Sequence, residues 1–343
     1  MSERQRVLSG MRPTGPLHLG HLVGALKNWV ELQERYDCFF MVADWHALMS
    51  EYEHPSEIAE NSRQMVYDWL AAGIDPRRSN VCIFRQSDIQ EHLELYMVLS
   101  IIAPLGWVER VPTYKEQLRE VKGRDLATYG FLGYPVLQAA DILLYKADTV
   151  PVGEDQIPHL ELTREIVRRF KFLYSADIFP EPKPLLTQEA KLLGLDGRKM
   201  SKSYDNFIAL SESPDEIRKK AQKMFTDPKR IKMTDPGHPE TCNVCHYWQV
   251  FAPQEAPKMW EECRTSKRGC TQNKQELAEL LIGKTERYRQ VREEARMRGV
   301  TAGVTGDADK ILADGATRAR AIAKDTMTEV RKAIKLPLSI RYA

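Results

Sequence analysis

The sequence lacks any apolar run near the roughly 18 residues that a helix needs to cross a membrane. Its first residues, 1–6, are not followed by the apolar core of a signal peptide. We therefore expect no contact with a membrane and a cytoplasmic location. The chain also lacks an excess of charge, because its formal net charge is +2 at pH 7. A field from the whole protein cannot attract a polyanion, so any contact with nucleic acid must come from a local patch.

Cysteine is scarce, and there are no internal repeats or low-complexity tracts. Six cysteines among 343 residues are too few for a disulfide scaffold. Cys38 and Cys82 lie inside apolar runs, where cysteine acts as a small core residue. The other four fall together within 242–270.

Short apolar runs alternate with segments of helical spacing through the first half of the chain. The runs with strand character are 6–9, 38–43, 81–84 and 149–152, and the helical segments are about 18–36, 55–72, 87–103 and 157–174. Alternating strands and helices predict a parallel sheet with right-handed crossovers. The predicted fold is therefore α/β, a doubly wound, Rossmann-like nucleotide-binding domain.

The C-terminal third reads as all-helical. A helix is expected to begin at Ser213-Pro214-Asp215-Glu216, and two long charged helices are expected over about 274–298 and 307–335. The proline-rich connector 179–184 marks a hinge or boundary. We therefore expect a sheet domain over 1–190 and a helical domain over 191–343. Whether the last helix packs back on the sheet does not follow from the sequence.

Polar residues gather where the predicted strands end. The glycine-punctuated turn 10–15, then Asp44 and His46, then Gly153 to Gln156 each follow a strand. Ligands of doubly wound folds bind at that rim of the sheet. Asp141 is a different signal, because it interrupts the apolar helical run 134–145 and a buried carboxylate needs a partner.

Two short motifs suggest phosphate chemistry. His18-Leu19-Gly20-His21 puts two imidazoles one turn apart at a helix start, with a glycine that lets a ring or phosphate approach the backbone. Lys199 to Ser203 forms a basic loop after several glycines. Alone, each motif is equally consistent with an exposed turn. Together they predict two sides of a triphosphate site.

These two motifs match the signatures of the class I aminoacyl-tRNA synthetases. The stretches 134–145, 150–156 and 159–165 resemble, more narrowly, the tryptophan-specific bacterial branch of that family. The resemblance runs through nearly the whole chain. It implies activation of L-tryptophan by ATP to tryptophanyl-adenylate, transfer to tRNA(Trp), Mg²⁺ bound with ATP, and a homodimer joined through an insertion in the sheet domain.

The resemblance also implies roles for individual residues. His18, His21, Lys199 and Lys202 would stabilise the phosphates during adenylation. The full set expected to contact ATP is Arg12, Pro13, Thr14, Gly20, His21, Gly153, Glu154, Asp155, Leu192, Lys199, Met200, Ser201, Lys202 and Ser203. Asp141 would accept the indole N–H, and a buried acceptor discriminates against substrates without a donor. The other expected tryptophan contacts are Tyr134, Gln138, His46, Gln156 and Leu8.

Cys242, Cys245, Cys263 and Cys270 supply four thiolates, enough for zinc or a 4Fe-4S cluster. Some bacterial members of the family carry such a cluster beside the anticodon-binding surface. Asn273 stands where the family has its fourth cysteine, so Cys245 would have to substitute. Thiols without a metal are the alternative. Arg264, Lys267 and Arg268 lie between two of these cysteines and are candidate contacts for RNA phosphates.

Three alternatives stay open at this point. A tyrosine-specific synthetase would need a pocket for a phenol, whereas the context of Asp141 and of 153–156 favours tryptophan. A small-molecule adenylyltransferase shares the His-x-Gly-His turn, but it needs neither Lys199 to Ser203 nor a long helical tail. A non-catalytic RNA-binding paralogue would not need both motifs intact.

Overall fold

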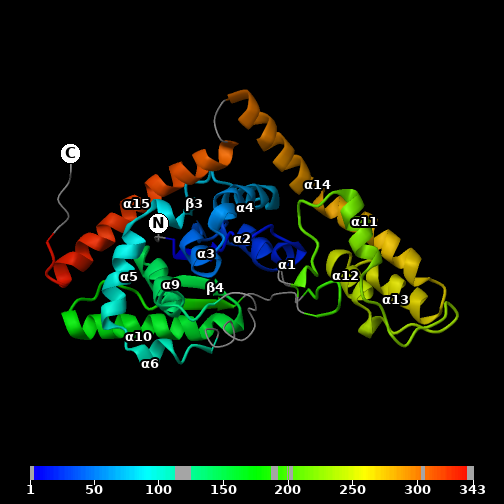
Figure 1. Cartoon of the computed structure of the whole chain (residues 1–343), viewed down its shortest axis with the longest axis horizontal. Coiled ribbons are helices and arrows are strands. Elements are labelled where there is room, and N and C mark those ends of the chain that lie inside the picture. The colour runs from blue at the N-terminus through cyan, green and yellow to red at the C-terminus, as the bar shows by residue number, and fades with distance from the viewer. Residues whose placement is uncertain are drawn as a thin grey trace.

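A computed structural model describes residues 4–112, 125–186, 192–198, 200, 204–302 and 306–337. Figure 1 shows a body built around the sheet and a helical lobe beside it, with the long helix α14 running from that lobe back toward the sheet. No helix in these described ranges combines the length and the apolar character that crossing a membrane requires.

The sheet has five strands in the order β3-β2-β1-β4-β5, and every neighbouring pair is parallel. The strands are β1 (Arg6–Met11), β2 (Asp37–Val42), β3 (Val81–Arg85), β4 (Thr149–Val152) and β5 (Lys183–Leu186). The doubly wound α/β prediction is confirmed. The sequence did not indicate β5, because Pro184 and the two other prolines of the connector 179–184 are typical of a loop. The segment becomes a strand by pairing with β4.

The helices and helical turns follow in chain order: α1 (Leu19–His21), a π-helical segment (Leu22–Leu26), α2 (Lys27–Leu32), α3 (Asp44–Glu51), a 3-10 turn (Pro55–Glu57), α4 (Ile58–Ala72), a 3-10 turn (Gln86–Asp88), α5 (Glu91–Ile102), α6 (Leu105–Val108), α8 (Tyr129–Leu132), α9 (Tyr134–Leu144), a 3-10 turn (Glu154–Gln156), α10 (Ile157–Tyr174), α11 (Pro214–Gln222), a 3-10 turn (Pro239–Thr241), α12 (Asn243–Phe251), α13 (Ala256–Arg264), α14 (Cys270–Ala302) and α15 (Gly306–Ala333).

Most predicted helices are confirmed, and their ends have identifiable causes. α4 stops at Gly73, whose φ of 108° is left-handed backbone that glycine adopts without strain. Ser213 and Glu216 form the capping box that opens α11. The first helix was predicted to reach Tyr36 but ends at Leu32. It ends early because Asp37 already pairs with Arg6 in the sheet, so the chain must turn before that residue.

The strands β2 and β3 are buried on both faces, as their continuous apolar runs predict, whereas Lys183 and Leu186 of the edge strand β5 are exposed. Successive residues point to opposite sides, so Val7, Phe40 and Val42 pack with α2 and α4. Leu8 and Phe39 pack instead with α5, α9 and α10. The sheet is therefore fixed from both sides, and its strand ends form a rigid platform.

The last helix returns to the sheet. A Cβ built on Gly315 of α15 would lie 1.8 Å from the carbonyl oxygen of Ile83, so only glycine permits this approach to β3. Arg318 donates from Nη1 to the Val81 carbonyl oxygen at 2.8 Å. The Cys82 thiol lies 3.3 Å from the Gly315 carbonyl oxygen. The edge strand β3 is thus covered by a segment more than 200 residues away in the chain.

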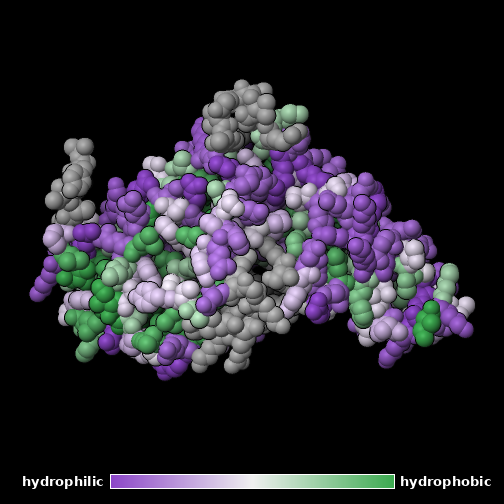
Figure 2. All heavy atoms as spheres, in the orientation of Figure 1, coloured by the Kyte–Doolittle hydropathy of each residue, from purple (hydrophilic) through white to green (hydrophobic). Residues whose placement is uncertain are grey.

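Exposed apolar side chains gather over α5, α6 and the end of α10. Figure 2 shows hydrophobic residues collected on that side of the sheet body, away from the helical lobe. We call them the α5–α10 patch, and its exposed members are Met97, Ile101, Leu105, Phe172 and Leu173. A patch of this kind marks an interaction surface.

We predict that Gly315→Ala destabilises the protein by about 1–3 kcal/mol, the usual cost of overpacking, because the methyl group collides with the β3 backbone. Thermal unfolding followed by circular dichroism measures the effect. The matched control is Gly283→Ala on α14, where an added Cβ meets no atom within 4 Å. That change should stabilise by up to ~1 kcal/mol through helix propensity. Equal melting curves for wild type and Gly315→Ala would contradict the close packing of α15.

Candidate active site

The order of the strands locates the site. β1 lies between β2 and β4, so the crossovers leave β1 in opposite directions and the loops at its C-terminal end diverge. Such a switch point is where open parallel sheets bind ligands. A pocket of about 370 Å³ opens there, within the range of small-molecule sites.

The pocket gathers side chains that are distant in the sequence. All six residues expected to contact the amino acid line it, namely Leu8, His46, Tyr134, Gln138, Asp141 and Gln156. Arg12 and Gly153, from the set expected to contact ATP, line it as well. Further lining residues that the sequence did not suggest are Met41, Met49 and Phe131. The result is a pocket of mixed character, with apolar and polar side chains side by side.

Asp141 is the buried charge at the base of this pocket, with a relative exposure of 1%. Its Oδ1 accepts from Gln86 Nε2 at 2.8 Å and from His92 Nδ1 at 2.7 Å. Its Oδ2 lies 2.8 Å from His46 Nε2. Burial works to raise the pKa of Asp141, but the hydrogen bonds from His46 and His92 outweigh it and hold that pKa below its ordinary value. The prediction that this carboxylate needs partners is confirmed.

Sequence reasoning missed three residues behind the pocket: Gln86, His92 and Tyr145. His92 is fully buried in α5, and its Nε2 lies 2.7 Å from the Tyr145 hydroxyl oxygen. No motif or spacing marks any of the three. The only available signal was indirect, since a carboxylate expected to be buried implied donors from unidentified elements.

Tyr134 and His159 form a second polar contact at the pocket wall. Tyr134 Oη and His159 Nε2 are 3.4 Å apart. Burial, with a smaller effect of the nearby His46, lowers the pKa of His159 to about 4. His159 is therefore neutral at pH 7. Gln156, which lines the pocket, donates from Nε2 to Asp155 Oδ2 at 3.0 Å.

The two histidines of the first motif lie together outside the pocket lining. The backbone N–H of His18 donates to His21 Nδ1 at 3.1 Å, and the ring centroids are 3.8 Å apart. A Cβ on Gly20 would lie 3.0 Å from His18 Nδ1 and 3.3 Å from Met200 Sδ. Glycine is therefore needed here for close approach.

One residue of the second motif, Met200, lies beside the first motif. Lys199, Ser201, Lys202 and Ser203 fall outside the described residues, but Met200 approaches Gly20, as above. The segment after the loop pairs with the first motif, since Leu19 N–H donates to the Ile208 carbonyl oxygen at 3.1 Å. Leu210 N–H donates to the Leu17 carbonyl oxygen at 2.9 Å. The first motif and the segment that follows the second thus share one β-bridge, between His18 and Ala209.

The remaining residues expected to contact ATP are spread around the pocket entrance. Pro13 is buried, and Thr14 N–H donates to the Arg12 carbonyl oxygen at 2.9 Å. Glu154 and Asp155 are exposed on the 3-10 turn after β4. Leu192 is buried with Leu195 and is not among the residues that line the pocket.

The cysteines of the helical lobe converge in part. Cys245 hydrogen-bonds with Cys242 and Cys263, which lowers the pKa of both partner thiols and raises that of Cys245. Arg230 Nη1 lies 3.7 Å from Cys263 Sγ, and Asn273 Nδ2 lies 3.9 Å from Cys245 Sγ. In the described part of the chain, no three His, Cys, Asp or Glu side chains are arranged to hold a metal ion. The metal site therefore stays a prediction.

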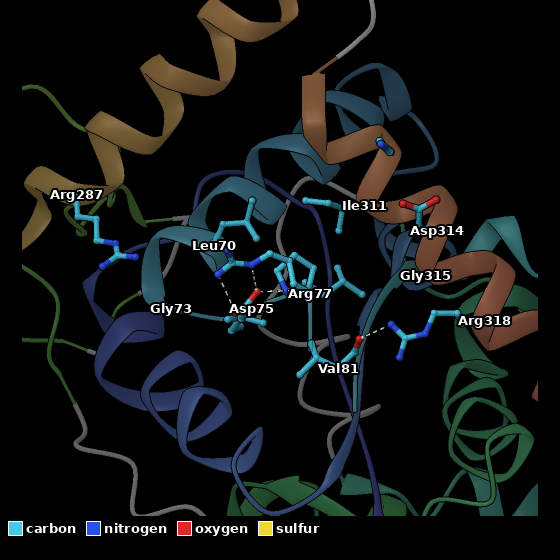
Figure 3. Close-up of a pocket in the computed structure, with 14 residues that line it drawn as sticks. Leu70, Gly73, Asp75, Arg77, Val81, Arg287, Ile311, Asp314, Gly315 and Arg318 are labelled. Atoms are coloured by element: carbon cyan, nitrogen blue, oxygen red, sulfur yellow. Dashed lines mark hydrogen bonds and ion pairs between the residues drawn. The ribbon is translucent and has the colours of Figure 1, made fainter. Parts of the chain in front are cut away.

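A larger hollow of about 670 Å³ lies outside the predicted site, among α4, β3, α14 and α15. Figure 3 shows Arg287 on one wall and Asp314 and Arg318 on another, with Arg318 bonded to the Val81 carbonyl oxygen. It contains none of the residues that the sequence analysis singled out.

Comparisons with known proteins agree with this arrangement. The sequence profile of the family described as tRNA synthetases class I (W and Y) matches residues 1–283. A tryptophan–tRNA ligase of Thermotoga maritima is 48% identical, over 96% of this chain and 99% of its own length. One from Aquifex aeolicus is 41% identical, over 97% of this chain and 100% of its own length.

Solved structures show the same likeness. The crystal structure of a tryptophanyl-tRNA synthetase from Campylobacter jejuni, in complex with ADP and tryptophan, is similar with a TM-score of 0.86 and 34% identity. That similarity covers 96% of this chain and 100% of the other. A tyrosyl-tRNA synthetase from Archaeoglobus fulgidus has a TM-score of 0.64 at 21% identity, which shows a shared fold alone.

Proposed function

We propose that this chain, which belongs to the class I tRNA synthetases for tryptophan and tyrosine, acts as a tryptophan–tRNA ligase. It activates L-tryptophan with ATP, releases pyrophosphate, and transfers the tryptophanyl group from the adenylate to tRNA(Trp). Charging of tRNA serves protein synthesis, so the working compartment is the cytoplasm. ATP and L-tryptophan are the small-molecule substrates, and Mg²⁺ enters with ATP.

The observation that carries the tryptophan assignment is Asp141 at the base of the pocket. Its carboxylate is buried and ionised, and three donors hold it. An indole offers one N–H donor on a flat apolar body, which matches the Asp141 acceptor in a pocket that also presents apolar side chains such as Met41 and Phe131. A ligand without such a donor would leave the buried carboxylate short of a partner, and that penalty provides specificity.

The first step needs no catalytic base. The carboxylate of tryptophan is already ionised at neutral pH, so its oxygen can attack the α-phosphorus of ATP directly. The P–O bond to the β-phosphate breaks and its electron pair leaves with pyrophosphate. The protein therefore has to hold the reactants in line and stabilise the spread of negative charge.

His18, His21 and the lysines supply that stabilisation. The paired imidazoles donate hydrogen bonds to phosphate oxygens, while Lys199 and Lys202 neutralise the leaving pyrophosphate and Ser201 and Ser203 donate to it. The contact of Met200 with Gly20 supports this assignment, because it brings the loop against the histidine turn. Mg²⁺ bound to ATP would withdraw further charge from the phosphates.

The other residues expected to contact ATP come from two turns and from Leu192. Gly153, Glu154 and Asp155 hold adenosine, and Asp155 accepts from ribose hydroxyls. Arg12, Pro13 and Thr14 contact ATP from the turn after β1. Leu192 contacts adenine through its backbone, since its side chain is buried among core residues.

The tyrosine-specific reading has less support, because the tyrosine-specific relative shares the fold alone at 21% identity. An adenylyltransferase for small molecules would have no use for the helices α11 to α15.

We assign residues 1–190 to catalysis and dimerisation, and residues 191–343 to the lysine loop and to binding of the anticodon. Within the second region α15 packs on β3, which ties the tRNA-binding part to the sheet. Arg264 and Lys267 are the candidate RNA contacts, because Arg268 is buried in ion pairs with Glu262 and Glu276.

We also propose that two copies form a homodimer through the α5–α10 patch. Met97, Ile101 and Leu105 are 61%, 71% and 58% exposed. Side chains of this size are rarely left in water as a group. Burying them against a second copy gives an interface with an apolar core.

The cysteine cluster could hold a 4Fe-4S cluster or Zn²⁺. Thiolates are the right ligands for either, and three of the four sulfurs already contact one another. A bound metal would cross-link α12, α13 and α14 in the helical lobe, because Cys242 precedes α12, Cys245 is on α12, Cys263 is on α13 and Cys270 begins α14.

We predict that ATP–pyrophosphate exchange depends on L-tryptophan and not on L-tyrosine. Asp141→Ala should lower kcat/KM for tryptophan by about 100-fold, because the indole N–H loses its charged acceptor. Steady-state exchange kinetics with each amino acid measure both effects.

The control for that experiment is Asp177→Ala, which removes an exposed carboxylate far from the pocket and should leave exchange unchanged. Circular dichroism of Asp141→Ala checks that the fold survives. Equal exchange with tyrosine, or none with either amino acid, would refute the assignment. Full selectivity in Asp141→Ala would mean that the indole is recognised elsewhere.

For the homodimer, we expect light scattering to give twice the chain mass for the wild type and the single mass for Met97→Glu/Ile101→Glu. Two buried charges at the interface centre cost more than the patch provides. Ile231→Glu, at an apolar position that is 87% exposed in the helical lobe, is the matched control and should stay dimeric. A wild-type monomer would rule the interface out.

For the cysteines, we expect anaerobically purified protein to contain stoichiometric iron or zinc. Broad visible absorbance and elemental analysis distinguish the two metals. Cys245→Ser should lose the metal, whereas Cys38→Ala, in the sheet, should keep it. Metal-free wild type with full exchange activity would favour free thiols.

A further inference from the structure

We propose that His92, oriented by Tyr145, is a positioning residue that fixes the Asp141 carboxylate so that one oxygen lone pair is left for the indole N–H of the substrate. The inference rests on the proposed function and extends it to residues that touch neither substrate. Neither His92 nor Tyr145 lines the pocket, and the hydrogen bonds that connect them to it run through Asp141.

The hydrogen bonds of Asp141 can be counted against its capacity. A carboxylate offers about four acceptor positions, two on each oxygen. Gln86 and His92 occupy both positions on Oδ1, at 2.8 and 2.7 Å. His46 occupies one on Oδ2, at 2.8 Å. The hydrogen bonds from the described residues thus leave one position on Oδ2, on the oxygen shared with His46, which itself lines the pocket.

The direction of the hydrogen bonds follows from Asp141. An ionised carboxylate can only accept, so His92 Nδ1 carries a hydrogen and donates to Asp141 Oδ1 at 2.7 Å. In a neutral ring Nε2 is then the acceptor, and the buried Tyr145 hydroxyl, 2.7 Å away, is the donor that matches it. Tyr145 thereby favours the tautomer in which His92 donates to Asp141.

The orientation of the Gln86 side-chain amide shows how strongly a hydrogen bond to Asp141 is favoured. Its amide nitrogen reaches Oδ1, while its amide oxygen is buried without a hydrogen-bond partner among the described residues. An unpaired buried carbonyl is costly. This orientation holds because reversing the amide would direct an oxygen at the carboxylate.

His92 is thus more than a filler of the core. Without it, Oδ1 loses a donor, and the carboxylate can rotate or take the indole on the wrong oxygen. Recognition would then lose both energy and geometry, whereas ligands that do not use the N–H would lose neither.

The experiment compares tryptophan with 3-benzothienyl-alanine, in which sulfur replaces the indole N–H. The readouts are KM and kcat for tryptophan in ATP–pyrophosphate exchange, KM for ATP, and the inhibition constant of the analogue. The variants are His92→Leu, which removes the donor, His92→Asn, whose amide nitrogen falls close to Nδ1, and Tyr145→Phe, which removes only the hydroxyl.

We expect His92→Leu to raise KM for tryptophan by about 10- to 100-fold, the value of a hydrogen bond to a charged group. Neither kcat nor KM for ATP should change, and the inhibition constant of the analogue should change by less than about threefold. His92→Asn should recover most of the loss, and Tyr145→Phe should show a smaller loss of the same kind. His238→Leu, which breaks another His–Asp contact in the helical lobe, is the matched control and should leave all constants unchanged.

Equal weakening of tryptophan and analogue, or no recovery in His92→Asn, would overturn the inference and leave a role in packing alone. Tyr145→Phe keeps the test informative if His92→Leu fails to fold, since it deletes a single atom. Wild type without tryptophan-dependent exchange would instead refute the proposed function, and this inference with it.

Discussion

A single buried carboxylate constrains the whole catalytic end of the sheet. Asp141 is almost without solvent contact, and an ionised group in such a place is stable only if donors replace the lost water. The donors come from His46 on α3, Gln86 after β3, and His92 on α5. Because α9 carries the acceptor, these elements must keep their relative positions for the charge to persist. The specificity pocket therefore belongs to the core as much as to the surface.

The parallel sheet converts that constraint into a site. β1 and β4 lie side by side although they are far apart in the sequence, and the loops at their ends diverge around one pocket. The histidine turn and the segment after the lysine loop are joined by backbone hydrogen bonds between 17–19 and 208–210. Under the proposed function, these bonds hold the two phosphate-binding elements together, which suits a reaction that depends on alignment.

The helical lobe is fastened to the sheet body by contacts that the strand order alone does not require. Arg292 on α14 forms a bidentate ion pair with the buried Asp68 on α4. Its Nη2 lies 2.8 Å from Oδ2 and its Nε lies 3.1 Å from Oδ1. Gly315 then allows α15 to lie directly on β3. Under the proposed division of roles, these contacts connect the part that binds tRNA with the part that activates the amino acid.

The sequence by itself determined the local features of this protein. Periodicity located α10 to the residue, and residues 213–216 indicated the capping box of α11, because both depend on interactions within a few residues. The apolar run 149–152 located β4, although its pairing with β1 and β5 is long-range. The two motifs indicated the family, and Asp141 stood out as a charge in an apolar helix.

Only the tertiary structure decided which residues donate hydrogen bonds to Asp141. Gln86, His92 and Tyr145 carry no local signature, since what matters is their distance from a side chain many residues away. The same holds for β5, which becomes a strand only beside β4, and for α15, which reaches the sheet only because Gly315 has no side chain. Long-range packing selects among arrangements that local sequence leaves equally favourable.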